Sequence, residues 1–168
     1  MCFDFTRFGR KGENNISSCI IVQYPKKTFV GVDSAVSKKH EDGYKRTSNV
    51  GKKFFKFGDY GVFCSGDFYE VNTIVSYIES LNIISIELLS DFCKSTQFKN
   101  FDLLVFKDNH IYQISPYLNY KISPILPPSD GVQIYSAGFK TKVAVEFMEY
   151  EMLSNKDIFD CYANVFEK

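Results

Sequence analysis

The chain has 168 residues, of which 45% are apolar, and this is enough to bury the core of one domain. Its twenty basic and twenty acidic residues give a formal net charge of zero, and no basic stripe is interleaved with aromatic residues, so we expect no nucleic acid partner. No apolar stretch approaches the length of a membrane span, and residues 1–7 lack the apolar core of a secretory signal, so we expect a cytoplasmic protein without membrane contact.

The cysteines and histidines argue against several classes of site. The five cysteines are odd in number, widely scattered and free of any C-x-x-C spacing, which argues against a disulfide framework and against a zinc site. Only His40 and His110 supply imidazoles, and neither lies in the sequence context of a nucleophile elbow. The cysteines that we expect to be small buried apolar residues are Cys19, Cys64, Cys93 and Cys161.

The first third of the chain is expected to form an arm and two hairpins. Residues 1–16 contain a polar, glycine-containing stretch and are predicted to be an N-terminal arm or propeptide. Residues 17–24 and 28–34 are apolar runs on either side of a Pro25-Lys26-Lys27 turn, which predicts the first hairpin. Residues 38–48 are polar and charged, and they are expected to be a connection. The apolar runs 50–57 and 60–65, on either side of Gly58-Asp59, predict the second hairpin.

Two helices and a third hairpin follow. Apolar residues at three-to-four spacing from Val71 to Leu81 predict an amphipathic helix that Asp67 caps. A second helix is expected over residues 85–96. Residues 101–106 and 111–114 predict a hairpin around an Asp108-Asn109 turn, and four prolines between positions 116 and 128 mark a long irregular connection.

The last part of the chain predicts one strand and two helices. Residues 132–135 form the expected strand, which ends at Ser136-Ala137-Gly138, and a helix should start near Lys140. Ser154 and Asp157 have the spacing of a capping box that opens a last helix. Along the chain, the expected order is thus two hairpins, two helices, further strands and two more helices, without regular alternation of strand and helix. This order predicts an α+β fold, an αββα sandwich, formed by a single domain over residues 17–168.

Residue types suited to nucleophilic hydrolysis fall at the strand ends of this expected fold. Ser17 heads the first strand, Asp33 ends its hairpin partner, and the Lys52-Lys53 pair heads the third strand. A hydroxyl, a carboxylate and an amine that meet at one edge of a sheet are the parts of a nucleophilic hydrolase.

From Ser17 to about position 166 the chain resembles the proteasome β subunits and, more closely in length, the bacterial HslV peptidase, which are N-terminal nucleophile hydrolases. Mature chains of that family begin with a nucleophilic Thr and an apolar strand, and residues 17–22 (SSCIIV) match this pattern with Ser in place of Thr. Residues 31–34 (GVDS) match the segment of the family's catalytic Asp, sixteen positions after Ser17. The resemblance implies that Ser17 is the nucleophile and Asp33 the catalytic carboxylate.

Three further segments resemble the family. Residues 53–57 (KFFKF) match the strand headed by the catalytic Lys, which implies Lys53; Lys52 is the alternative if the following turn has the family's usual length. Residues 62–67 (VFCSGD) match the segment before the first helix, which implies that the Gly66 N–H donates to the oxyanion. Residues 135–138 (YSAG) resemble the family's Gly-Ser-Gly segment, which implies that Ser136 supports the amine of the nucleophile.

The resemblance also implies how the site would work. The free α-amino group of the nucleophile serves as its base, because that amine titrates near neutrality. Ser17 is internal, so activity requires cleavage after Ile16. The family implies polypeptide substrates, a homo-oligomeric ring and an ATP-dependent unfoldase as partner, with no metal and no organic cofactor. The chain stops about where the last helix should end, so we expect a C-terminally shortened form of the fold.

Two other functions stay open at this point. Proteasome α subunits share the fold and keep an uncleaved extension without doing chemistry, so the chain is alternatively a catalytically inactive, ring-forming or regulatory subunit. The second alternative is an amidase in which removal of Met1 exposes Cys2 as an N-terminal nucleophile.

Overall fold

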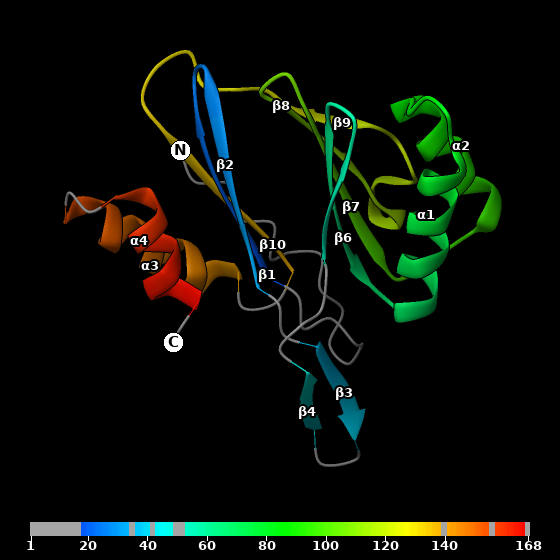
Figure 1. Ribbon diagram of the computed structural model, residues 1–168, viewed down its shortest axis with the longest axis horizontal. Helices are drawn as coiled ribbons and strands as arrows, with labels where there is room; N and C mark the ends of the chain where they lie inside the picture. Colours follow the sequence, from blue (N-terminus) through cyan, green and yellow to red (C-terminus); the bar gives the residue numbers. More distant parts are fainter. Residues whose placement is uncertain are drawn as a thin grey trace.

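Two antiparallel sheets face each other, and each carries a pair of helices on its outer side (Figure 1). The computed structural model describes residues 18–33, 36–40, 43–48, 53–138, 141–154 and 157–166. The first sheet has the order β10-β1-β2, and its strands are β1 (Ser18–Tyr24), β2 (Lys27–Val32) and β10 (Gln133–Gly138). The second has the order β5-β6-β7-β8-β9, and its strands are β5 (Phe54–Phe57), β6 (Tyr60–Gly66), β7 (Phe101–Lys107), β8 (His110–Ile114) and β9 (Ser123–Ile125).

The four helices form the outer layers. Helices α1 (Phe68–Ser80) and α2 (Ile86–Thr96) cover the second sheet, and α3 (Thr141–Leu153) and α4 (Ile158–Phe166) cover the first (Figure 1). The predicted αββα sandwich is therefore confirmed. No helix among these described residues is long and apolar enough to cross a membrane.

Three apolar cores separate the four layers, and strand alternation explains them. In β1, Cys19 and Ile21 join the core between the sheets, whereas Ile20 and Val22 join the core under α3 and α4. In β6, Phe63 likewise faces the other sheet and Val62 faces the helices. Because both faces of these strands are buried, they appear in the sequence as continuous apolar runs instead of alternating ones.

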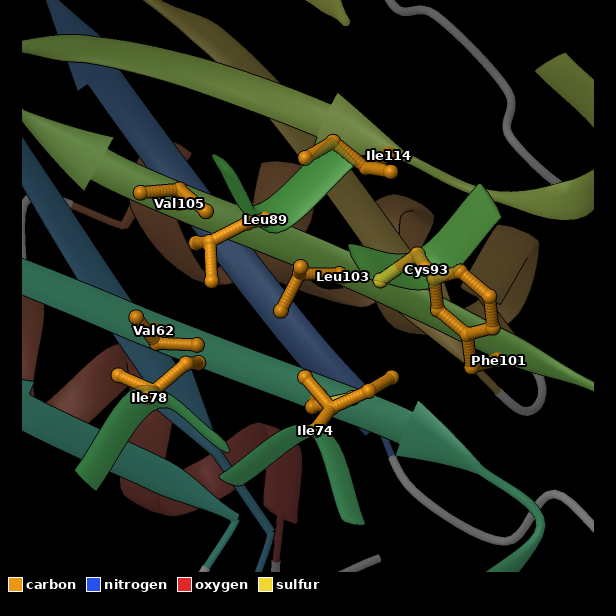
Figure 2. Close-up of a cluster of buried hydrophobic side chains, with 10 residues drawn as sticks. Val62, Ile74, Ile78, Leu89, Cys93, Phe101, Leu103, Val105 and Ile114 are labelled. Carbon is orange, nitrogen blue, oxygen red and sulfur yellow. The ribbon is translucent and has the colours of Figure 1, made fainter. Parts of the chain in front are cut away.

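The core under α1 and α2 is shown in Figure 2, where strands of the second sheet supply one side and the two helices the other. Ile74 and Ile78 come from α1, Leu89 and Cys93 from α2, so each helix presents one apolar face to the sheet. The i, i+4 spacing of each pair places the two side chains on one side of their helix. The strand residues that complete this core are Val62, Cys64, Phe101, Leu103, Val105 and Ile114.

Helix starts follow the polar residues that the sequence supplies. The Asp67 side chain accepts hydrogen bonds from the Tyr69 and Glu70 N–H groups, which confirms the predicted cap of α1. The Ser85 side chain caps α2 in the same way through the Leu88 N–H. At α4 the predicted capping box is wrong in position, since Asp157 itself accepts from the Phe159 N–H and Ser154 lies in the turn that ends α3.

Three strand assignments differ from the prediction. Residues expected to be a connection form a two-stranded hairpin of β3 (Val36–His40) and β4 (Gly43–Ser48), which projects beyond the sandwich in Figure 1. The proline-rich connection contains the short edge strand β9, where Pro124 is tolerated because an edge strand has backbone groups without ladder partners. Strand β10 continues through Ser136 to Gly138 instead of ending before them.

Four cysteines are buried, as predicted, and they act as apolar groups. Burial raises the pKa of the Cys93 thiol to about 12, and it raises the pKa values of Cys19 and Cys64 as well. These thiols are therefore not ionised near neutral pH and are not nucleophiles. Cys2 lies outside the described residues.

Candidate active site

An ion pair joins the two sheets at one end of the sandwich. The Lys53 Nζ lies 2.7 Å from the Asp33 Oδ1. Asp33 follows the last residue of β2 in the first sheet, and Lys53 precedes the first residue of β5 in the second. Their side chains are only 10% and 18% exposed for the lysine and the aspartate. The pair is therefore held in a partly dehydrated position between the sheets, where charge interactions are stronger than in water.

The start of β1 holds the same carboxylate in place. The Ser18 backbone N–H donates to Asp33 Oδ1 over 3.1 Å, and the Asp33 N–H donates to the Ser18 carbonyl oxygen, also over 3.1 Å. This contact follows from the register of the hairpin, because the turn at Pro25 and Lys26 puts Tyr24 opposite Lys27 and Cys19 opposite Val32. The next facing pair is Ser18 and Asp33. The Asp33 Oδ1 thus accepts hydrogen bonds from the Lys53 ammonium and from the backbone N–H of Ser18, the residue that follows Ser17.

The structure therefore brings Asp33 and Lys53 together, as the sequence predicted. Ser17 and the alternative lysine Lys52 lie outside the described residues, so their roles stay predictions. In the part of the chain that the structure describes, no three His, Cys, Asp or Glu side chains are grouped so that they could hold a metal ion.

Gly66 ends β6 in a conformation that only glycine adopts easily. Its φ is +141°, and a Cβ added there would lie 2.0 Å from the carbonyl oxygen of Asn100. The adjacent Asp67 N–H donates to that same oxygen over 2.7 Å, so the Asn100 backbone cannot move away cheaply. Close backbone packing is thus sufficient to require a glycine at position 66, independently of any role of its N–H in binding an oxyanion. The predicted role as oxyanion donor stays a prediction.

Ser136 lies in β10, the strand that pairs with β1. In the β1–β10 register it faces Ile20, whereas Gly138 faces Ser18. Facing residues of an antiparallel pair share one side of the sheet, so Ser136 lies on the side of Ile20, under α3 and α4. The residue is 2% exposed.

Solved structures provide the comparison for this arrangement. HslV from Trypanosoma brucei superimposes with a TM-score of 0.59 at 12% sequence identity, covering 89% of this chain and 88% of that chain. BPH from Thiobacillus denitrificans gives 0.56 at 16% identity, covering 79% and 77%. The chain has the proteasome-like fold of N-terminal nucleophile hydrolases. An Anbu mutant from Hyphomicrobium sp. strain MC1 also matches, with a TM-score of 0.52 at 8% identity, covering 84% and 76%. No protein-family model matches the sequence, and no curated protein matches it significantly.

Within this proteasome-like fold, the structure adds a polar group that the sequence analysis did not single out. Ser65 of β6 faces Asp102 of β7, and both alternate with residues of the helix-side core, so they face the other sheet. The Gln113 Nε2 donates to Asp102 Oδ1 over a long 3.5 Å. The Ser65 hydroxyl is buried and has no hydrogen-bond partner among the described residues. The signal in the sequence was Asp102 inside an otherwise apolar strand.

Burial affects the acidity of this group. It raises the pKa of Asp102 to about 6, and the hydrogen bond from Gln113 offsets only part of the shift. Ser65 and Asp102 lie at the strand ends near Lys53. The backbone N–H of Cys64, the residue before Ser65, donates to the Lys53 carbonyl oxygen over 3.5 Å. A carboxyl that is half ionised near pH 6 therefore lies at the same end of the sandwich as Lys53.

Proposed function

We propose that this chain is an N-terminal nucleophile peptidase that cleaves polypeptides, with Ser17 as the nucleophile once residues 1–16 are removed. One observation carries the proposal: Asp33 binds Lys53 and the N–H of Ser18, the residue to which Ser17 is bonded. A lysine held by a carboxylate next to the N-terminal hydroxyl is the combination such chemistry needs. The proteasome-like fold supports the same assignment.

The proposed reaction starts when cleavage of the Ile16–Ser17 bond frees an α-amine. That amine takes the proton of the Ser17 hydroxyl, whose oxygen attacks the substrate carbonyl, and the amine later returns a proton to the leaving amine. The Lys53 ammonium stabilises the negative charge that develops on the attacking oxygen. The Gly66 N–H is the proposed donor to the tetrahedral oxyanion, and water then hydrolyses the ester to Ser17.

Each remaining residue has a more limited part. Asp33 is a positioning residue, because it holds the Lys53 ammonium and the start of β1 through one oxygen. The support that Ser136 was predicted to give the amine of Ser17 stays a prediction. No step in this reaction needs a metal or an organic cofactor.

We also propose that the chain assembles into a closed homo-oligomeric ring that an ATP-dependent unfoldase feeds. Large apolar side chains are exposed on the outer helices, and such surfaces commonly mark protein contacts. Phe68 and Tyr69 at the start of α1 are 78% and 72% exposed, and Leu153 and Phe159 of α3 and α4 are 82% and 68% exposed. Native mass spectrometry of the purified chain measures the ring size directly.

Intact mass measurement of the protein purified from cells tests the nucleophile. We expect the wild-type chain to lose residues 1–16 and Ser17→Ala to keep them, because the hydroxyl that attacks the preceding carbonyl is absent. Ser18→Ala is the matched control: it removes the neighbouring hydroxyl and leaves the backbone N–H that donates to Asp33, so processing should continue. A processed chain should also retain epoxomicin, the ligand with which BPH was solved.

The other results assign the chain to its alternatives. Loss of the arm from Ser17→Ala as well would mean that another protease removes it, and Ser17 would lose its assignment. A mass at full length would favour the inactive ring-forming subunit. Loss of Met1 alone, with a Cys2→Ala variant that loses an amidase activity seen in the wild type, would favour the Cys2 enzyme.

A further inference from the structure

A cleft lies at the end of the sandwich away from Asp33 and Lys53. The turns β1–β2, β5–β6 and β7–β8 meet there, at the top of Figure 1. Residues of all three turns and of the adjoining strands line a cleft of about 370 Å³. Ligand clefts commonly measure about 300–1,000 Å³, so this one suits a short stretch of chain better than a folded partner.

The lining carries a local excess of positive charge in a chain that is neutral overall. The lining contains four lysines but only two carboxylates, those of Asp59 and Asp108. Within the described ranges, none of these lysines has a carboxylate at ion-pair distance. The four lysines are Lys26, Lys27, Lys56 and Lys107.

Two of the lysines are held by aromatic rings instead. The Lys107 Nζ donates to the Tyr60 hydroxyl over 2.9 Å and lies 4.6 Å from the centre of that ring. The Lys27 Nζ lies 5.2 Å from the ring centres of both Tyr24 and Phe29. Cation–π contacts position an ammonium without neutralising its charge, so both groups keep their attraction for an anion.

The lining also includes an apolar surface between the two sheets. Val30 of β2 and Phe54 of β5 contribute to it, and Phe54 packs against Phe106 of β7 with ring centres 5.7 Å apart. These three side chains are only partly buried by the rest of the protein. A ligand that presents an apolar group beside its negative charge would cover them.

The cleft is built on a fixed frame. The Asn109 Nδ2 donates to the carbonyl oxygens of Tyr24 and Pro25, at 3.0 Å each. The Thr28 hydroxyl donates to the Asn109 side-chain oxygen, and the Gln23 Nε2 donates to the Asn109 carbonyl over 2.7 Å. These bonds tie the β1–β2 turn of one sheet to the β7–β8 turn of the other. The lysines are thus presented on a preformed surface, which lowers the entropy cost of binding.

Both sides of the cleft end in edge strands. Strand β2 is the last strand of its sheet and β5 the first of the other, within the part of the chain that the structure describes. Edge strands present backbone N–H and C=O groups that an extended peptide can pair with. In such a peptide, side chains alternate between two sides, so carboxylates and apolar groups can face different partners.

We propose that this cleft binds an extended acidic peptide segment, with carboxylates at Lys26, Lys56 and Lys107 and apolar side chains against Phe54 and Phe106. A peptide uses the strand edge, the apolar surface and the positive charge together. A polyphosphate would use only the charge and would leave the apolar surface and the strand edges uncovered. The site is independent of the reaction proposed for the opposite end of the sandwich, and it stands whether or not Ser17 is a nucleophile.

Fluorescence anisotropy with a labelled peptide of sequence Glu-Phe-Glu-Val-Glu tests the site on the full chain. We expect Lys26→Glu combined with Lys56→Glu to weaken binding by about tenfold or more, because two exposed attractive charges become repulsive. The matched control reverses two exposed lysines elsewhere, Lys94 and Lys121, and should leave the affinity within about twofold. Affinity should fall as salt is raised, and the Gln-Phe-Gln-Val-Gln peptide should bind more weakly.

Three results would overturn the proposal. One is an absence of binding at millimolar peptide; another is equal loss of affinity in the cleft variant and the control variant. The third is displacement of the peptide by inorganic tripolyphosphate together with an unchanged affinity for the glutamine peptide, which would assign the lysines to phosphate groups instead.

Discussion

The Lys53 ammonium reaches across the gap between the two sheets and lies 2.7 Å from the Asp33 carboxylate, so that one ion pair connects the end of β2 with the start of β5. Ser18 donates to the same carboxylate from a third strand. The pair therefore has two separable consequences, one for stability and one for the proposed chemistry at Ser17.

We expect Asp33→Asn to lower the free energy of unfolding by about 3 kcal/mol, because it removes the carboxylate charge that lies 2.7 Å from an ammonium on a lysine only 10% exposed. Urea denaturation measures the change. Lys142→Met is the control, since Lys142 and Glu146 form an exposed pair at 4.0 Å on α3, and we expect that change to cost less than about 0.5 kcal/mol. Equal losses in the two variants would show that the Asp33–Lys53 pair is effectively solvated.

The double variant Asp33→Asn/Lys53→Met separates stability from chemistry. It removes both charges, so much of the stability lost in Asp33→Asn should return. Removal of residues 1–16 should fail in this variant, because the ammonium that we propose to assist Ser17 is gone. If processing returned together with stability, the pair would be structural only.

The fold could be predicted where the sequence carries a strong local pattern. Continuous apolar runs with turn residues between them located β1, β2, β6, β7 and β8, and apolar residues at helical spacing after the Asp67 cap located α1. The β3–β4 hairpin escaped prediction because its residues, such as Lys38, Lys39 and Lys45, show no apolar alternation. Strand β9 escaped because Pro124 is ordinarily a sign against a strand, and only its place at a sheet edge makes it acceptable.

The candidate site was predictable in part for a similar reason. Asp33 and Lys53 lie at strand ends that the hairpin turns themselves determine, so spacing along the chain was informative. The position of Ser136 depends on how β10 pairs with β1 across more than a hundred residues of chain, and no local pattern specifies that register. Asp102 was visible as a polar interruption of a strand, but its burial depends on the first sheet, which packs against that face of β7.

The helix α4 is fastened to the first sheet at Gly31. The Tyr162 hydroxyl lies 3.2 Å from the carbonyl oxygen of Ile20 and 3.0 Å from that of Phe29, and its single proton is shared between these two acceptors, which fixes the ring over β2. A Cβ on Gly31 would lie 2.2 Å from Tyr162 Cδ1 and 2.9 Å from Phe166 Cε2. We expect Gly31→Ala to lower the free energy of unfolding by about 1–3 kcal/mol, measured by urea denaturation, because a ring anchored through its hydroxyl must be displaced.

Tyr162→Ala provides the check on this explanation. It removes the ring atoms that a Cβ on Gly31 would meet, so adding Gly31→Ala to it should cost clearly less than in the wild type. Additive losses in the double variant would mean that the ring is not what excludes a side chain at position 31.

The buried carboxyl of Asp102 makes stability depend on pH in a direction opposite to that of a salt-bridged carboxylate. Its pKa is raised from 3.8 to about 6, so the folded state holds this proton where the unfolded state has lost it. Below pH 3.8 the Asp102 carboxyl is protonated in both the folded and the unfolded state, so it does not lower the free energy of unfolding. As the pH rises from 3.8 to about 6, the free energy of unfolding falls. Above about pH 6 the whole loss is present, and it amounts to about 3 kcal/mol for a pKa raised by about two.

Asp102→Asn removes the charge and keeps an acceptor for Gln113. We therefore expect it to raise the free energy of unfolding by about 3 kcal/mol at pH 8 but by only about 1 kcal/mol at pH 4.5, where most of the cost has not yet appeared. Urea denaturation at both pH values measures the difference, and Asp130→Asn, which removes the same charge from an exposed loop, should change stability by less than about 0.5 kcal/mol at either pH. A gain for Asp102→Asn that is the same at both pH values would mean that packing, and not ionisation, limits stability at this position. A pH-dependent gain would instead establish an ionisable carboxyl between the sheets, next to the strand end that carries Lys53.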